Sequence, residues 1–168
     1  MMVEKKSGTI FNISSGGGLK YLFNAVYGIG KCALDRMTQD TAVELREHNV
    51  AVVGIWPGAV KTEAIQDMKD DEMFEQNRAR GESTDFVGKA ITHLVAGEPN
   101  MIKRTGRVLF TLDLAKEFKF REDDGKLPFD VFGVKAAFEM NGNTWLAAVT
   151  PGSMKMPRSM LYMAGFKF

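Results

Sequence analysis

A serine pair, a tyrosine and a lysine stand at spacings that suit proton transfer to or from an oxygen atom. The serines are Ser14 and Ser15, and Tyr27 and Lys31 follow later in the chain. Residues four apart in a helix lie on one face, so the tyrosine and lysine side chains would stack in a helix. A hydroxyl, a phenol and an ammonium that converge can serve an alcohol or a carbonyl.

The chemistry requires these residue types. A phenol, with an ordinary pKa of about 10, holds its proton too tightly to act as a base at neutral pH. An ammonium within about 4–6 Å favours the phenolate and lowers that pKa. A serine hydroxyl both donates and accepts hydrogen bonds, so it can hold a substrate oxygen against the phenol. Because none of these side chains can remove a hydride, a hydride carrier would have to be a cofactor.

The elements of a parallel α/β sheet surround these residues. Apolar runs at 9–13 and 50–56 are typical of strands, and the second is apolar enough to be covered on both faces. Between them, apolar positions recur at helical spacing over 25–47, with Asn24 as a plausible N-cap. The remaining expected elements are a helix that Ser83 or Thr84 caps and Gly97 ends, and a third strand over 106–112.

Three motifs in this order resemble the short-chain dehydrogenase/reductase family. They are Asn12-x-Ser14-Ser15, Tyr27-x-x-x-Lys31 and Pro57-Gly58-x-Val60-x-Thr62, each after the element that the family pattern requires. The resemblance extends over nearly the whole chain. Within the family the chain is most similar to one type of dehydrogenase/reductase, through Tyr21-Leu22-Phe23-Asn24, Trp56-Pro57-Gly58, Asp113-Leu114-Ala115 and Lys167-Phe168.

The resemblance implies NAD(P)-dependent interconversion of a carbonyl and an alcohol. Tyr27 would be the acid or base, Lys31 would modulate its pKa and contact the cofactor ribose, and Ser15 would orient the carbonyl. The family pattern usually places the catalytic serine second in the pair, which favours Ser15. Loop length varies at this point, so spacing alone leaves Ser14 open, and its alternative role is to cap its own loop.

The resemblance also assigns a cofactor site to the loop after the second strand. The loop residues of that site are Pro57, Gly58, Val60 and Thr62, and Tyr27 and Lys31 complete it. The main chain near Val60 and the Thr62 hydroxyl would hold the nicotinamide amide, although Thr62 can also be an N-cap over Glu63. NADP is the expected cofactor and NAD the alternative, because no residue that selects between them is recognised in this chain.

The expected fold is α/β: the carboxyl-terminal half of a Rossmann-type parallel sheet, three strands with flanking helices, followed by a carboxyl-terminal extension. We assign residues 1–115 to the catalytic part and residues 116–168 to the extension. The glycines at 16–18 and 28–30 lack the spacing of a dinucleotide-binding fingerprint. The alternative to an enzyme is therefore a truncated, inactive fragment or an incomplete gene model that acts at most through interactions.

Composition disfavours several other classes of protein. With 45% hydrophobic and 26% charged residues among 168, the chain is ordinary for a globular protein. A net charge of +1 without a basic block gives no sign of a nucleic-acid partner. The single cysteine, Cys32, precludes an internal disulfide and fits a reducing compartment. No metal site is expected, because His93 has no second ligand nearby.

The extension is rich in aromatic residues and methionine, so it has apolar surface to bury. It could cover a substrate cleft, pack on a second copy in a homo-oligomer, or lie on a membrane surface with Lys155, Arg158 and Lys167 at its polar edge. The expected partner is a small carbonyl or alcohol substrate, with a second copy or a peripheral membrane contact as further alternatives. A cytoplasmic location is expected, with association with the endoplasmic reticulum membrane as the alternative.

Overall fold

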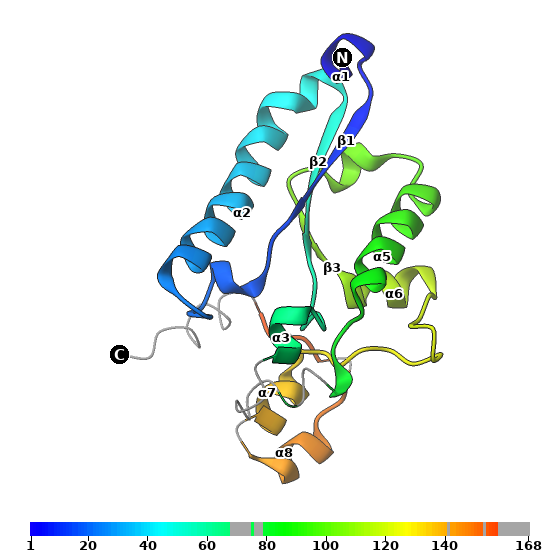
Figure 1. Cartoon of the computed structure of the whole chain (residues 1–168). Coiled ribbons are helices and arrows are strands. Elements are labelled where there is room, and N and C mark those ends of the chain that lie inside the picture. Colours follow the sequence, from blue (N-terminus) through cyan, green and yellow to red (C-terminus); the bar gives the residue numbers. More distant parts are fainter. Residues whose placement is uncertain (68–74, 76–78, 141, 153, 158–168) are drawn as a thin grey trace.

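The computed structural model describes residues 1–67, 75, 79–140, 142–152 and 154–157. Its centre is a parallel sheet that lies between helices (Figure 1). The strands are β1 (Gly8–Ile13), β2 (Val50–Trp56) and β3 (Val108–Phe110), in the order β1-β2-β3. The expected α/β class and the three parallel strands with flanking helices are confirmed.

Strand β2 forms the middle of the sheet and is buried at every position. Ile13 pairs with Ile55, and Trp56 pairs with Phe110. An apolar run without alternation is the pattern of a parallel strand that helices cover on both faces. Because the three strands run in the same direction, their carboxyl ends meet at one edge, where such sheets bind ligands.

Helix α2 (Ala25–Leu45) covers one face of the sheet (Figure 1). It begins where predicted, because the Asn24 side chain accepts a hydrogen bond from the Tyr27 N–H at 2.9 Å. Beneath it, Asn12 Nδ2 donates to Thr38 Oγ1 at 3.0 Å, which joins β1 to the middle of the helix. The 3-10 turn η2 (Arg46–His48) then leads into β2.

Helices α5 (Thr84–Gly97) and α6 (Thr111–Phe118) cover the other face. Ser83 is the N-cap of α5, because its hydroxyl accepts from the Phe86 N–H at 3.1 Å. Each large apolar side chain that is fully buried here stabilises the fold by about 1.5–3 kcal/mol. The buried core on this face consists of Val53, Ile55, Phe86, Ala90, Leu94, Leu114, Ala115 and Phe120.

The third strand is shorter than the predicted range 106–112. It ends at Phe110, and Thr111 already begins α6. Gly106 has φ 75° and forms the turn before the strand, a conformation that favours glycine. The helix buries Leu112 on its inner face. A short apolar run does not distinguish a strand from the first turn of a buried helix, which explains the error.

From α7 onward, the described part of the extension lies beyond the carboxyl ends of the strands, whereas Phe120 belongs to the core beneath α5 and α6. The extension contains α7 (Val134–Met140) and α8 (Thr144–Val149), near the short helix α3 (Glu63–Asp67) (Figure 1). The division at residue 115 stays a prediction, and α6 runs across it. The other short elements are α1 (Met2–Lys5), the 3-10 turn η1 (Gly16–Gly18) and the 3-10 turn η3 (Met101–Arg104).

The environment of Lys155 differs from that of a lysine at the polar edge of a membrane-facing tail. Lys155 is half-buried, and its ammonium lies 2.8 Å from a carboxylate oxygen of Asp113 and 2.8 Å from one of Asp130. Arg158 and Lys167 lie outside the described residues. Within the described ranges, no helix combines the length and the apolar character that crossing a membrane would require.

Candidate active site

Ser15 and Tyr27 meet at the carboxyl edge of the sheet. Ser15 Oγ and Tyr27 OH lie 2.9 Å apart, within hydrogen-bond distance. Ser15 follows β1, Tyr27 lies in the first turn of α2, and η1 folds the chain back between them. The Ser15 hydroxyl also accepts from the Gly17 N–H at 2.9 Å, which fixes its position at the start of η1.

Gly17 and Gly18 of η1 are required by close packing against α2. A Cβ added at Gly17 would lie 2.5 Å from the Tyr27 ring. A Cβ added at Gly18 would lie 2.9 Å from the backbone nitrogen of Cys32. A side chain at either position would push the loop away from the helix and separate Ser15 from the phenol.

Ser14 has a different environment from Ser15. It is 2% exposed, and its hydroxyl donates to the Lys31 carbonyl at 3.0 Å. The Ser14 side chain therefore ties the loop to α2. The structure brings Ser15, and not Ser14, to the Tyr27 hydroxyl.

Lys31 lies beside Tyr27 on the same face of α2, as the four-residue spacing predicts. Its ammonium donates to the Ile13 carbonyl at 3.2 Å and lies 5.6 Å from the centre of the Tyr27 ring. The hydrogen bond to the end of β1 holds the charge at the same edge as the two hydroxyls. Three polar groups of the expected kinds therefore gather at the end of one strand.

The loop after β2 is held by backbone hydrogen bonds to Glu82. The Glu82 N–H donates to the Ala59 carbonyl at 2.7 Å, and the Lys61 N–H donates to the Glu82 carbonyl at 2.8 Å. Val60 and Glu82 thus form an isolated parallel bridge. At the end of the loop, Thr62 Oγ1 accepts a long hydrogen bond of 3.4 Å from the Ile65 N–H, so the N-cap role proposed for Thr62 is present.

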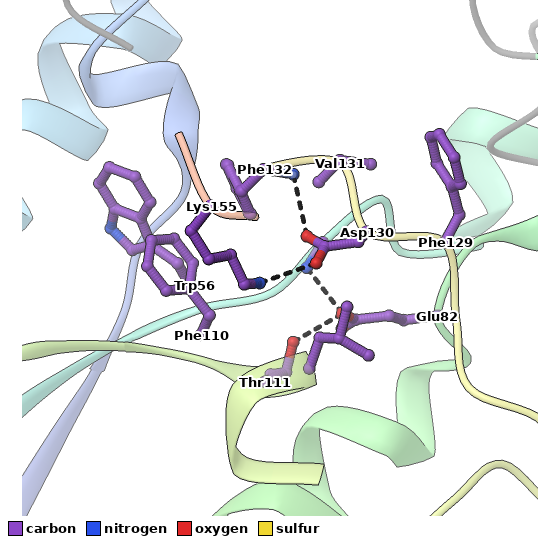
Figure 2. A pocket seen from close by; sticks show the side chains of 11 residues that line it. Trp56, Glu82, Phe110, Thr111, Phe129, Asp130, Val131, Phe132 and Lys155 are labelled. Carbon is purple, nitrogen blue, oxygen red and sulfur yellow. Dashed lines mark hydrogen bonds and ion pairs between the residues drawn. The ribbon is translucent and has the colours of Figure 1, made fainter. Parts of the chain in front are cut away.

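The Glu82 side chain lies beneath the same loop (Figure 2). Its Oε1 accepts from the Gly58 N–H at 2.9 Å and from Thr111 Oγ1 at 2.6 Å, and the residue is 1% exposed. Among the described residues, nothing makes a hydrogen bond with Oε2. The pKa of this carboxyl is raised to about 6, chiefly by burial and also by the charges of Glu122 and Asp130, against the lowering effect of its hydrogen bonds with Thr111 and Gly58.

Sequence reasoning missed Glu82. The available signal was an acidic residue directly before the N-cap Ser83, at the end of a charged segment without regular apolar spacing. Nothing in that pattern distinguishes a buried acid from an exposed one. Its partners Gly58 and Thr111 are distant in the chain, and only the sheet brings them together.

The raised pKa of Glu82 predicts a pH-dependent contribution to stability. The folded state holds the proton more tightly than the unfolded chain, so the contribution is full below the ordinary pKa of 4.5 and is lost as pH rises through about 6. We expect wild type to lose about 2 kcal/mol of unfolding free energy relative to Glu82→Gln between about pH 4 and pH 7. Urea denaturation of both proteins across this range measures the difference. Parallel pH profiles would contradict the assignment.

No group of three or more His, Cys, Asp or Glu side chains that could hold a metal ion occurs in the part of the chain that the structure describes.

The chain matches known proteins both over the segment that holds the three motifs and over its whole length. The family model described as short chain dehydrogenase matches residues 1–73. Dehydrogenase/reductase SDR family member 1 from Mus musculus is 34% identical over 178 aligned residues, which cover 100% of this chain and 56% of the mouse protein. The Homo sapiens protein of the same name gives the same identity and coverage. The chain therefore spans about half the length of the curated relatives it matches.

Solved structures share the arrangement of the sheet and helices. The crystal structure of acetoin dehydrogenase from Salmonella typhimurium has a TM-score of 0.52 and 29% identity, and the match covers 66% of this chain and 45% of that one. The structure described as ElxO with NADP bound also has a TM-score of 0.52 and 29% identity, over 66% of this chain and 47% of that one.

Proposed function

We propose, on the premise that this chain belongs to the short-chain dehydrogenase/reductase family, that the complete product of its gene interconverts a carbonyl and an alcohol with NADP. The observation that carries the proposal is the contact of 2.9 Å between Ser15 Oγ and Tyr27 OH, with the Lys31 ammonium beside the ring. Two hydroxyls at this distance can share one substrate oxygen. The bound nicotinamide supplies the hydride when a carbonyl is reduced.

The chain's own residues orient the carbonyl, transfer the proton and stabilise the charge that develops. Ser15 donates a hydrogen bond to the carbonyl oxygen and orients it, because its hydroxyl is fixed at the start of η1. Tyr27 donates its proton to that oxygen as the alcohol forms and takes a proton from the alcohol in the reverse direction. Lys31 places a positive charge beside the phenol, which favours the phenolate that remains.

The loop residues Pro57, Gly58, Val60 and Thr62 fit a nicotinamide amide. In the parallel bridge between Val60 and Glu82, the peptide groups of Glu82 form hydrogen bonds with Ala59 and Lys61, the two neighbours of Val60. The N–H and C=O groups of Val60 itself therefore point away from Glu82. A backbone donor and the exposed Thr62 hydroxyl two residues on can bind an amide oxygen and an amide nitrogen. Tyr27 and Lys31 would contact the ribose next to it.

NADP is the preferred cofactor in this proposal, and NAD is the alternative. The support is a structure with NADP bound that is 29% identical to this chain. The proposed substrate is a small carbonyl compound or alcohol. A second copy of the chain is the proposed macromolecular partner, because α2 exposes apolar side chains such as Val26 at 80% and Ile29 at 70%. We propose a cytoplasmic location, in keeping with the unpaired Cys32.

The proposal predicts NADPH-dependent reduction of a small diketone by the complete gene product. We expect NADPH consumption to equal alcohol formation, and we expect NADH to be at least about tenfold less efficient, as losing one charged contact would cause. Absorbance of the reduced cofactor and chromatography of the product measure the two quantities. A folded protein that consumes neither cofactor with any of a panel of aldehydes, ketones and diketones would contradict the proposed activity.

A further inference from the structure

We propose that Glu82 is the positioning residue of the cofactor loop, residues 57–61, and that it acts through its hydrogen bonds rather than through its charge. This inference rests on the proposed function, because the loop is assigned to the nicotinamide. It adds a residue that lies outside the motifs of the family resemblance. The evidence is the number of contacts that one buried residue makes to a single short loop.

Glu82 holds the loop at three points. Its side chain accepts from the Gly58 N–H, its N–H donates to the Ala59 carbonyl, and its carbonyl accepts from the Lys61 N–H. The distances of these bonds are 2.9, 2.7 and 2.8 Å. The orientation of the Val60 peptide groups therefore follows from the position of Glu82.

The side chain also ties the loop to the third strand. The same Oε1 accepts from the hydroxyl of Thr111, the first residue of α6, which is fully buried. Gly58 must be glycine for this contact, because an added Cβ would lie 2.8 Å from Glu82 Oε1. The carboxyl ends of β2 and β3 are thus joined through one oxygen atom.

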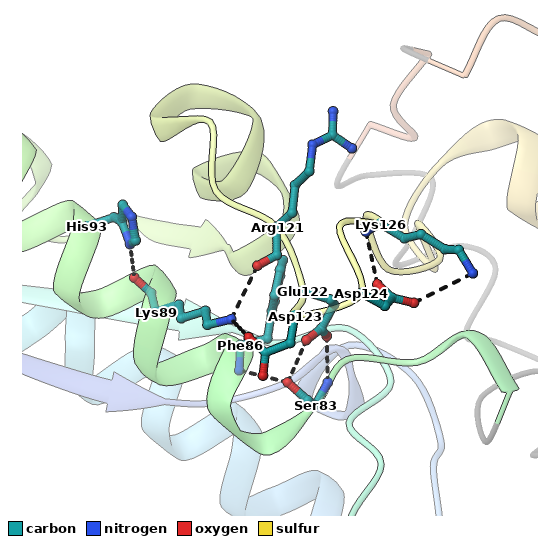
Figure 3. A network of polar contacts seen from close by, with 9 residues as sticks. All are labelled: Ser83, Phe86, Lys89, His93, Arg121, Glu122, Asp123, Asp124 and Lys126. Carbon is teal, nitrogen blue, oxygen red and sulfur yellow. Dashed lines mark hydrogen bonds and ion pairs between the residues drawn. The ribbon is translucent and has the colours of Figure 1, made fainter.

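Glu82 is itself held in place by its neighbour along the chain. The N–H and the hydroxyl of Ser83 donate to the two carboxylate oxygens of Glu122, at 2.7 and 2.6 Å (Figure 3). The Ser83 hydroxyl also caps α5. This network fixes the backbone of residues 82–83 against a rigid helix, so Glu82 can serve as a fixed reference for the loop.

The second carboxyl oxygen makes no contact that requires a negative charge. Oε2 has no hydrogen-bond partner among the described residues, and Glu82 lines a cavity of about 10 Å³, about the space that one water molecule needs. The charged groups that line this cavity are Asp130 and Lys155 (Figure 2), and Glu122 lies nearby. Lys155 is already paired with Asp130 at 2.8 Å and with Asp113, so it does not neutralise Glu82. Oε1 accepts from both of its donors whether or not Oε2 carries a proton, so these hydrogen bonds do not require the charge.

An acceptor that acts without its charge can be replaced by an amide, and this makes the role testable. Glu82→Gln keeps an Oε1 acceptor, whereas Glu82→Leu keeps the approximate volume and leaves the Gly58 N–H and the Thr111 hydroxyl unpaired. In the complete gene product we expect Glu82→Gln to keep the KM for NADPH within about threefold of wild type. We expect Glu82→Leu to raise it at least about tenfold, with a smaller fall in kcat, as one unsatisfied buried donor predicts. Glu44→Leu, at an exposed position of α2, is the matched control.

Two further measurements keep the proposal testable if Glu82→Leu fails to fold or if the enzyme shows no turnover. Gly58→Ala pushes the loop from the other side of the same contact, so it is expected to raise the KM for NADPH as Glu82→Leu does. Amide hydrogen exchange of Gly58 and Lys61 needs no activity, and it should be at least about tenfold faster in Glu82→Leu than in wild type or Glu82→Gln. Unchanged exchange in Glu82→Leu would overturn the proposal even if the enzyme is active. Equal defects in the Gln and Leu variants would show that the charge of Glu82 is required, which would overturn the proposed role of its hydrogen bonds.

Discussion

Replacing Tyr27 by phenylalanine is expected to lower the turnover of the complete gene product by about 10²–10⁴-fold, the usual contribution of a positioned acid or base. The change removes one oxygen atom and keeps the ring. The ring packs edge-on against Phe23 with centroids 5.0 Å apart, and this contact remains. The loss of the hydrogen bond to Ser15 costs only about 1 kcal/mol of stability.

The matched control for Tyr27→Phe is Tyr21→Phe. Tyr21 lies in the loop before α2, is 75% exposed, and its hydroxyl donates to the Phe23 carbonyl at 3.3 Å. Turnover in this variant should stay within about twofold of wild type, since surface substitutions have small effects. The reaction is followed by NADPH consumption at saturating cofactor. Retention of most activity by Tyr27→Phe would remove the tyrosine from the mechanism.

Replacing Lys31 by methionine is expected to impair both turnover and cofactor binding. Methionine keeps most of the apolar stem but loses the ammonium beside Tyr27 and the hydrogen bond to the Ile13 carbonyl. We expect kcat to fall by about 10²-fold, in the range of an acid–base contribution. The Kd for NADPH should rise about tenfold, because charged hydrogen bonds to the ribose would be lost.

Steady-state kinetics and calorimetric titration with NADPH separate these two effects of Lys31→Met. The control is Lys103→Met, which removes an exposed ammonium in η3, far along the chain from the candidate site. If Lys31→Met binds and turns over like wild type, the lysine is a surface residue that happens to lie four positions after the tyrosine.

The fold around the candidate site was largely predictable because local signals there agree with one another. Strand β2 is apolar at nearly every position, and Asn24 stands directly before a long helical pattern. The spacing of Tyr27 and Lys31 fixes their common face whatever the rest of the chain does. Only the glycine turn left a choice between Ser14 and Ser15, and that choice depends on which hydroxyl η1 turns toward α2.

The parts of the fold and of the site that the sequence did not predict depend on contacts between distant segments. Thr111 and Leu112 continue an apolar run, and only the packing of α6 on the sheet shows that they are helical. Glu82 resembles a surface acid until the sheet brings Gly58 and Thr111 to it. In the extension, Phe132 packs against Trp56 and against the place where a side chain at Gly16 would lie. Aromatic content alone does not reveal such a contact.

The central claim is that Ser15 and Tyr27 act together on one substrate oxygen, and a double-mutant cycle tests it most directly. Turnover of a small diketone with NADPH is measured for wild type, Ser15→Ala, Tyr27→Phe and the double variant of the complete gene product. Residues that act as a unit give non-additive losses, so the double variant should be no more than about threefold slower than Tyr27→Phe. A double variant whose loss equals the product of the two single losses would show that the hydroxyls act independently, which contradicts the claim.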